Sequence, residues 1–311
     1  MRSTTASRPW PTFSTSSTDE RVGVSTFDEA MVVTSQLQAS GDALGALYAA
    51  LRVEDEGLKV DPEVGARLDA IRAELGIGAL NDEDRRRVLG AIRAFTAQSA
   101  ALMAEPDRAP GWGETDPATL QSFGRMSMAV AELIGTFADL PPAPRILDIG
   151  TGVGLLAVAF CQRFAGATVV GVDVWTPSLA LARQNVESAG LADRIELREQ
   201  DVTTLNDEAA FDLVWVPAPF LPRAIVSDTL VRARRALKPG GWLVFGTFAG
   251  PPDRVATLVN ELRILRAGGH PWTDVDAVEA LRAAGFDDAA PAERTWSAPA
   301  AFVSARAAGG R

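Results

Sequence analysis

Three glycines at alternate positions are the residues best suited to hold a ligand against the backbone. Gly150, Gly152 and Gly154 follow the apolar run Arg145–Ile149 and precede a helical stretch. Glycine allows a sharp turn, and it leaves no Cβ in the path of an approaching ligand. Because open parallel sheets bind ligands at the carboxyl ends of their strands, the pattern predicts a ligand-binding turn after the first strand.

The spacing of these glycines excludes two common nucleotide sites. A dinucleotide fingerprint of the form G-x-G-x-x-G needs its third glycine where this chain has Leu155. A triphosphate-binding loop needs Lys followed by Ser or Thr, and no such pair follows here. Since glycine-rich turns also serve packing alone, the ligand has to be inferred from the neighbouring strands.

Two acids follow the next two expected strands. Asp173 comes directly after the strand Thr168–Val172, and its carboxylate could accept hydrogen bonds from both hydroxyls of a ribose. Asp201 comes after the strand Ile195–Glu199, and with Val202 it suits the amino group and the face of an adenine. The alternatives are a helix N-cap for Asp173 and a turn residue for Asp201.

Short apolar runs alternate with helical stretches after the proline-rich segment at 141–144. This alternation predicts an α/β fold in which a parallel sheet carries helices on both faces. Asp148, within the first strand, is expected to accept hydrogen bonds from the amides of the glycine turn. The other expected strands are Phe211–Val216, Trp242–Gly246, Ala292–Ser297 and Ala301–Ala305, and the expected helices are 155–164, 177–189 and 229–237.

The chain before residue 141 has helical periodicity instead. We predict three parts: a flexible tail at 1–26, in which Trp10 or Phe13 could provide partial order, an all-helical N-terminal domain at 27–140, and a ligand-binding domain at 141–311. The expected boundaries within the helical part are a start at Asp28, a break at Gly41, further starts at Pro62, Asn81 and Asp116, an end at Gly76, and one apolar face from Leu120 to Phe137.

Composition and charge narrow the function classes. The chain has 311 residues, 47% of them apolar, and a formal net charge of -10, which disfavours DNA or RNA as a partner. A single cysteine, Cys161, cannot form a disulfide within the chain and leaves little scope for a thiolate metal site. With neither a secretory signal nor a membrane-spanning run, the cytoplasm is the expected location.

Taken in order, these features resemble those of the class I S-adenosylmethionine (SAM)-dependent methyltransferases over roughly Arg145 to Ala305. The matching features are the D-x-G-x-G-x-G loop that begins at Asp148, the acids Asp173 and Asp201, and the L-K-P-G-G turn before the fifth strand. The resemblance implies a Rossmann-like, seven-stranded sheet of order 3-2-1-4-5-7-6, with the seventh strand antiparallel. It also implies SAM as the cofactor and S-adenosylhomocysteine (SAH) as the product.

The resemblance also assigns roles to residues at these positions. The glycine turn would approach the methionine part of SAM, the acid after the second strand would hold the ribose, and the residues after the fourth strand would border the sulfonium and its methyl group. The expected cofactor contacts are Asp148, Gly150, Thr151, Gly152, Gly154, Asp173, Val174, Trp175, Asp201, Val202, Val216 and Pro217.

The acceptor side is less defined by the sequence. Helices before the SAM domain commonly cover the acceptor in related small-molecule methyltransferases, and packing between domains is the alternative role for such residues. The candidate acceptor contacts are Trp112, Gln121, Phe123, Arg125 and Phe220. His270, the only histidine, is the candidate base, with an exposed loop position as the alternative, and Glu114 and Asp116 are weaker candidates.

One departure from the family pattern bears on the acceptor. Enzymes of this family that methylate base amines or glutamine amides carry a polar residue first in an N-P-P-Y-like motif, where this chain has Val216 in V-P-A-P-F. The sequence therefore favours methylation of an oxygen or carbon of a small molecule, such as a specialised metabolite, with no metal and no membrane. The alternatives are a protein or peptide methyltransferase and a non-catalytic SAM-fold partner. The N-terminal helices could form a homodimer.

Overall fold

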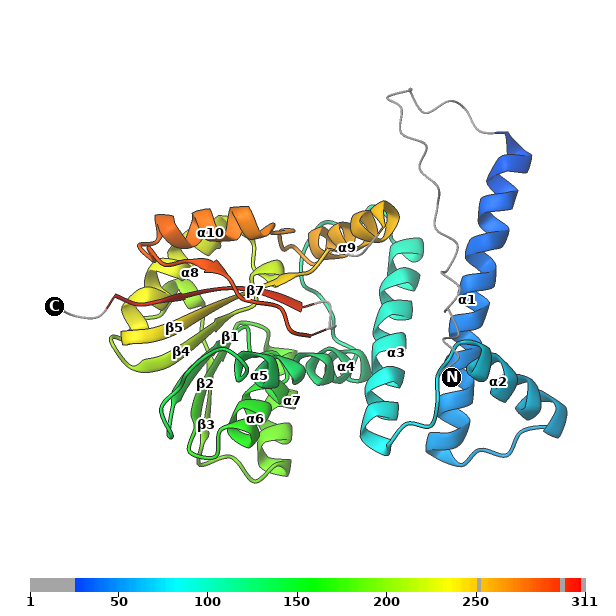
Figure 1. Ribbon diagram of the computed structural model, residues 1–311, viewed down its shortest axis with the longest axis horizontal. Coiled ribbons are helices and arrows are strands. Elements are labelled where there is room, and N and C mark those ends of the chain that lie inside the picture. Colours follow the sequence, from blue (N-terminus) through cyan, green and yellow to red (C-terminus); the bar gives the residue numbers. More distant parts are fainter. Residues whose placement is uncertain (1–25, 251–252, 297–299, 309–311) are drawn as a thin grey trace, which may run out of the picture. The chain divides into compact units, whose positions relative to one another are not determined.

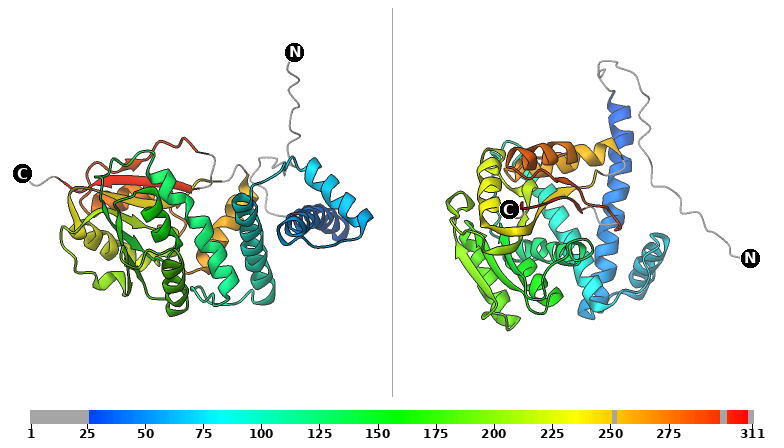
Figure 2. Two further views of the ribbon diagram at one scale, coloured as in Figure 1. Left: turned by 90° about the horizontal axis from the view of Figure 1, so that it is seen from below. Right: turned by 60° about the vertical axis from the view of Figure 1, so that its left-hand side comes forward.

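The computed structural model describes residues 26–250, 253–296 and 300–308 (Figures 1 and 2). The predicted flexible tail, with Trp10 and Phe13, lies outside the described residues except for Thr26. The chain divides into two compact units. The first, here called the helical unit, contains the residues up to Leu80 and the stretch that ends at Leu258, and the second, here called the sheet unit, contains Asn81–Gly250 and Val259 onward.

A seven-stranded sheet organises the second unit. Its strands are β1 (Arg145–Ile149), β2 (Thr168–Asp173), β3 (Ile195–Glu199), β4 (Phe211–Val216), β5 (Leu237–Phe248), β6 (Ala290–Pro291) and β7 (Ala300–Arg306). Their order is β3-β2-β1-β4-β5-β7-β6. Strands β1 to β5 run parallel, and β7 pairs antiparallel with β5, so that Trp242 lies opposite Arg306. The predicted fold class is confirmed.

Helices cover both faces of this sheet, as Figure 1 shows. They are α5 (Ala129–Ile134), α6 (Leu155–Arg163), α7 (Thr176–Ser188), α8 (Arg223–Ala236) and α10 (Asp274–Ala283). Helix α9 (Arg254–Arg266) comes between β5 and α10 in the chain. Alternate residues of one strand serve the two cores, so Leu243 packs with α8 and α10 while Val244 packs with α5 and α6. The inner strands are therefore apolar on both faces, as expected of a buried parallel sheet, whereas the edge strand β3 carries Glu196, Arg198 and Glu199.

Helices α3 (Asp82–Ala104) and α4 (Pro117–Ser127) belong to the sheet unit. Asn81 caps α3 through Asp84 N–H (2.8 Å), and Asp116 caps α4 through Thr119 N–H (2.8 Å), which confirms both predicted starts. The expected single face from Leu120 to Phe137 is divided between α4 and α5, with Met128 between them. Since α3 packs on α4, and α4 packs on α5, α6 and α7, the compact units separate after Leu80 rather than near residue 140.

The helical unit contains α1 (Phe27–Glu56) and α2 (Pro62–Glu74). The predicted break at Gly41 is wrong, because α1 continues through it, and a helix tolerates an interior glycine at a cost of about 1 kcal/mol. Pro62 begins α2 as predicted, and Gly76 follows the helix with a left-handed φ of +72°. No helix of the described residues is long and apolar enough to cross a bilayer.

The sequence misplaced several boundaries in the sheet unit. Helix α8 begins six residues before the expected Thr229, and β5 begins at Leu237, so the L-K-P-G-G segment lies within that strand. There Lys238 Nζ contacts Asp212 Oδ2 at 2.8 Å. The predicted strand Ala292–Ser297 is wrong over its described residues, because β6 is only Ala290–Pro291. After β6, the Ala292 N–H still donates to the Phe302 carbonyl of β7 at 2.8 Å.

Candidate cofactor and acceptor site

All three glycines of the turn after β1 have left-handed backbones. Their φ angles are +63° at Gly150, +56° at Gly152 and +73° at Gly154. A Cβ at Gly150 would lie 3.2 Å from Pro217, and one at Gly154 would lie 3.1 Å from Ala182. A Cβ at Gly152 would meet nothing nearer than 3.9 Å. The outer two glycines therefore permit close packing, and Gly152 presents its backbone to open space.

Asp173, at the end of β2, faces this turn. Its Oδ2 accepts the Gly152 N–H at 2.7 Å, and its Oδ1 accepts the Trp175 N–H at 2.8 Å. Burial raises the pKa of Asp173, while these backbone donors and that of Val174 oppose the rise. An ionised carboxylate has about four acceptor positions, so the two contacts leave capacity for two ribose hydroxyls. Asp173 itself is not the N-cap of α7, because Trp175 occupies that position.

Asp148 supports the glycine turn by accepting a hydrogen bond from a side chain of the turn rather than from its backbone amides. Its Oδ2 accepts the Thr151 hydroxyl at 2.7 Å, and the carboxyl is completely buried in β1. Burial raises the pKa of Asp148 to about 7, and the nearby Asp173 adds to the rise. The Thr151 side chain has room beside β2 because residue 171 is glycine. A Cβ at Gly171 would lie 2.6 Å from the Thr151 Oγ1. The sequence analysis missed Gly171, whose only signal was a glycine within an apolar strand.

On the adenine side of the predicted site, the structure shows the turn role of Asp201, and its adenine contact stays a prediction. Asp201 Oδ1 accepts the backbone N–H and the hydroxyl of Thr203, both at 2.8 Å, and so caps the short helix η1 (Val202–Thr204). Asp201 is nevertheless exposed, and Val174 is 62% exposed, so both can still meet a ligand. The Trp175 indole N–H donates to the Glu114 carbonyl at 2.7 Å, which ties the predicted adenine wall to the segment before α4.

Three of the five candidate acceptor residues come together. Trp112 lies 5.8 Å from Phe123 and 6.3 Å from Phe220, measured between ring centroids. Phe220 ends the short helix η2 (Ala218–Phe220) that follows β4, and its ring also contacts Phe248 at 6.0 Å. Pro217, at the head of η2, touches the glycine turn at Gly150. The aromatic cluster therefore borders the segment expected beside the methyl group.

Gln121 and Arg125 lie elsewhere on α4. The Gln121 amide exchanges hydrogen bonds of 3.0 and 3.2 Å with Asn185 of α7, and Asn185 also donates to the Val153 carbonyl at 2.7 Å. Gln121 thus fixes α4 to the glycine turn, and Asn185 is a residue that the sequence analysis missed. The Arg125 side chain runs beside Gly90 of α3, where burial lowers its pKa.

His270 is engaged by a cation. Its Nε2 lies 3.1 Å from Arg223 Nη1. Because arginine only donates, this ring nitrogen accepts, and its lone pair is occupied. Burial and the charge of Arg223 lower the pKa of His270. The carboxylate of Glu114 accepts two backbone N–H groups, and Asp116 caps α4, so none of the three candidate bases stands free in this arrangement.

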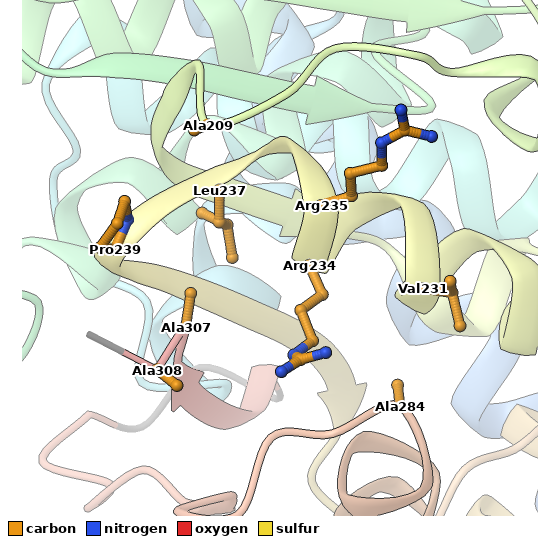
Figure 3. A pocket seen from close by; sticks show the side chains of 9 residues that line it. All are labelled: Ala209, Val231, Arg234, Arg235, Leu237, Pro239, Ala284, Ala307 and Ala308. Atoms are coloured by element: carbon orange, nitrogen blue, oxygen red, sulfur yellow. The ribbon is translucent and has the colours of Figure 1, made fainter. Parts of the chain in front are cut away.

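A separate shallow pocket of about 490 Å³ lies at the other end of β5 (Figure 3). It is lined by Ala209, Val231, Arg234, Arg235, Leu237, Pro239, Ala284, Ala307 and Ala308. Leu237 and Pro239 begin β5, whereas the candidate cofactor residues follow the carboxyl ends of β1 to β4. Arg235, on its rim, pairs with Glu208. This pocket is therefore not part of the candidate site.

Comparison with known proteins agrees with this geometry. Residues 146–241 match a family described as "Methyltransferase domain". The chain is 40% identical over 122 residues to the demethylmenaquinone methyltransferase of Thermus thermophilus, covering 39% of this chain and 54% of that protein. It is 32% identical over 146 residues to the release factor glutamine methyltransferase of Rhodopirellula baltica, covering 45% of this chain and 47% of that protein. The chain thus spans about half the length of these curated relatives.

Among solved structures, that of the pyocyanin biosynthetic protein PhzM superposes with a TM-score of 0.64 at 18% identity. The superposition covers 91% of this chain and all of PhzM, so the likeness of fold includes the region before the sheet. The domain built on the seven-stranded sheet belongs to the class I SAM-dependent methyltransferases. SAM is the cofactor of this class, and the open backbone at Gly152 beside the Asp173 carboxylate suits it.

Proposed function

We propose that this protein transfers a methyl group from SAM to a small-molecule acceptor. The observation that carries the proposal is the glycine turn after β1, where Gly152 faces open space while its N–H donates to Asp173. The match of residues 146–241 to methyltransferase domains supports the same conclusion.

SAM, when bound, supplies a methyl group that passes to the acceptor as the bond to sulfur breaks and its electron pair stays on sulfur. The backbone at Gly150–Gly154 would hold the methionine part, and Asp173 would hold the ribose. Val216, which is fully buried, and Pro217 would form an apolar wall beside the methyl group. Holding the acceptor in line with the carbon–sulfur bond can by itself supply much of the rate.

The acceptor atom that we favour is an oxygen or a carbon. The segment Val216-Pro-Ala-Pro-Phe220 contains no polar side chain that could hold an amine or amide nitrogen. The His270 Nε2 that accepts from Arg223 is not placed to take a proton, so a hydroxyl acceptor would lose its proton to solvent. A specialised metabolite is the acceptor class expected from the sequence, and the cytoplasm stays the predicted location.

A protein or peptide acceptor is the second candidate. The observation that favours it is the 32% identity to a release factor glutamine methyltransferase over 146 residues. The apolar residue at Val216 speaks against it, because an amide substrate needs a hydrogen-bond acceptor near its nitrogen. A non-catalytic SAM-binding partner would also bind SAM, but it would transfer no label.

We further propose that the protein is a homodimer through its helical unit. Helix α1 spans 30 residues, yet only Ala50 and Leu51 are buried in it. Apolar side chains at Val33, Leu37 and Leu44 are 46%, 54% and 36% exposed, at helical steps of four and seven. An exposed apolar stripe of this length favours association, and a second copy of the chain offers a matching surface.

Calorimetry with SAM and with SAH tests the main proposal. We expect both to bind to the full-length protein, and we expect Asp173→Ala to weaken binding at least about tenfold, since it removes two charge-assisted hydrogen bonds. The matched control is Asp287→Ala, at an exposed acid after α10, which should bind as the wild type does. Undiminished binding by Asp173→Ala would contradict the ribose assignment.

The acceptor class is tested with methyl-labelled SAM. The purified protein is incubated with fractionated metabolites or with protein extract. We expect label in a small molecule. Label in a polypeptide would instead support the second candidate, and SAM binding without any transfer would support a partner protein.

A further inference from the structure

Two of the exposed aromatic side chains of the sheet unit, Trp112 and Phe220, lie together, and the third, Phe95, packs against Arg263. Among its described residues, the exposed Phe and Trp side chains are Phe95 (39%), Trp112 (37%) and Phe220 (47%). Trp112 contacts Phe220, and it also contacts Phe123 of α4. Aromatic surface left open to water is costly, and a concentration of it marks a site that takes an apolar partner or ligand.

The end of α9 lies between two of these aromatic segments. The Gly111 N–H, just before Trp112, donates to the Arg266 carbonyl at 3.0 Å. A Cβ at Gly268 would lie 3.0 Å from Gly111, and one at Gly269 would overlap the Pro219 carbonyl, just before Phe220. Only glycines permit both approaches. The last turn of α9 is therefore fixed beside Trp112 and Phe220.

That turn begins at Arg263, whose charge has no acidic partner among the described residues. The guanidinium lies 5.2 Å from the centre of the Phe95 ring, and no carboxylate in the described part of the chain contacts it. Burial alone lowers the pKa of this half-buried side chain. Arg266, one turn later, instead donates to the carbonyl oxygens of Glu105 (3.0 Å) and Ala101 (3.4 Å).

A partly desolvated cation without a counter-charge costs free energy, and the Phe95 ring offsets only part of that cost. Acids are not scarce, since the chain has 40 Asp and Glu residues and a net charge of -10. In a protein of this net charge, a local cation such as Arg263 is needed to attract an anionic ligand. The planar guanidinium also matches the two oxygens of a carboxylate.

We propose that the methyl acceptor is an aromatic carboxylic acid, whose ring packs among Trp112, Phe123 and Phe220 and whose carboxylate pairs with Arg263. This inference rests on the proposed methyltransferase function and names the substrate class of the same site. Arg263 acts here as a specificity-determining residue, because it contacts the acceptor away from the atom that receives the methyl group.

Calorimetry with the SAH-saturated protein tests the proposal. The probes are hydroxybenzoates and hydroxynaphthoates, each compared with its own primary amide, which has nearly the same size but no charge. We expect the wild type to bind the best acids at least about tenfold more tightly than their amides. Arg263→Met should remove this preference and leave the amides bound as before, whereas Arg263→Lys should retain part of it.

The matched control is Arg282→Met, at an exposed arginine in the last turn of α10, which should keep the preference. SAH titration and thermal unfolding of each variant show whether it folds. A wild type that binds SAH but binds no acid of the panel, or binds acids no better than amides, would overturn the substrate class alone. A wild type that does not bind SAH would overturn the methyltransferase proposal itself.

Discussion

Asp148 is a residue whose ionisation should be visible in the stability of the whole protein. Its pKa rises from 3.8 to about 7 on burial, so the native state favours the protonated acid. Below about pH 4 both states are protonated, and between about pH 4 and 7 only the unfolded state ionises. The free energy of unfolding therefore falls as pH rises through this window, by at most about 4 kcal/mol.

Asp148→Asn removes this titration and keeps an oxygen for the Thr151 hydroxyl. We expect the variant to melt higher than the wild type at pH 8 and no higher at pH 4, as measured by circular dichroism. Asp287→Asn, at an exposed site, should melt as the wild type does at both values. An unchanged pH dependence in Asp148→Asn would show that the buried carboxyl does not titrate in this range.

Gly152 should separate backbone strain from cofactor binding. Gly152 has a φ of +56°, close to the +65° of Gly190. A Cβ at Gly152 would lie no nearer than 3.9 Å to any neighbouring atom, and a Cβ at Gly190 would have no neighbour within 4 Å. Alanine should therefore cost each a similar free energy of roughly 1–2 kcal/mol in denaturant unfolding. Only Gly152→Ala should lose SAM affinity, by at least about tenfold, because only its methyl group enters the cofactor space. Equal affinities in calorimetry would place SAM elsewhere.

At the scale of elements, helix α4 is fixed against the glycine turn. A Cβ at Gly124 would overlap Val153 and lie 3.2 Å from Leu155, the residues that flank Gly154. We expect Gly124→Ala to displace the turn and to weaken SAM binding about tenfold, while far-UV circular dichroism stays unchanged. The matched control is Gly41→Ala, where helix α1 leaves open space and alanine should stabilise by up to about 1 kcal/mol. Normal SAM affinity in Gly124→Ala would mean that α4 does not position the turn.

At the scale of the whole molecule, the exposed stripe on α1 predicts the state of association. We expect analytical ultracentrifugation to show a dimer, and we expect Leu37→Glu to shift it toward monomer, because a charge cannot be buried there without a partner. Val275→Glu changes a residue of α10 that is 67% exposed and should leave the dimer intact. A wild type that sediments as a monomer would contradict the proposal.

The inner strands of the sheet were predictable because they are local apolar runs. Strands β1 and β4 have the predicted bounds, since a buried parallel strand must be apolar on both faces and is bounded by residues that leave the core. The edge strand β3 also has the predicted bounds, although it alternates apolar and charged residues. The failures have physical causes as well. Gly41 lies within a long helix that tolerates it, and β6 pairs with β7 over only Ala290–Pro291, with one further hydrogen bond from the Ala292 N–H to the Phe302 carbonyl.

The sequence by itself determined the fold class and the candidate cofactor residues, because glycine spacing and strand-end acids are local features whose chemistry does not depend on distant segments. Only the tertiary structure decided how the acceptor side is built. It paired Gln121 with Asn185, brought Trp112 to Phe220 and placed Arg263 against the Phe95 ring, with no acid of the described residues beside it. These contacts join residues far apart in the chain, and no pattern within one segment records which side chains folding brings together.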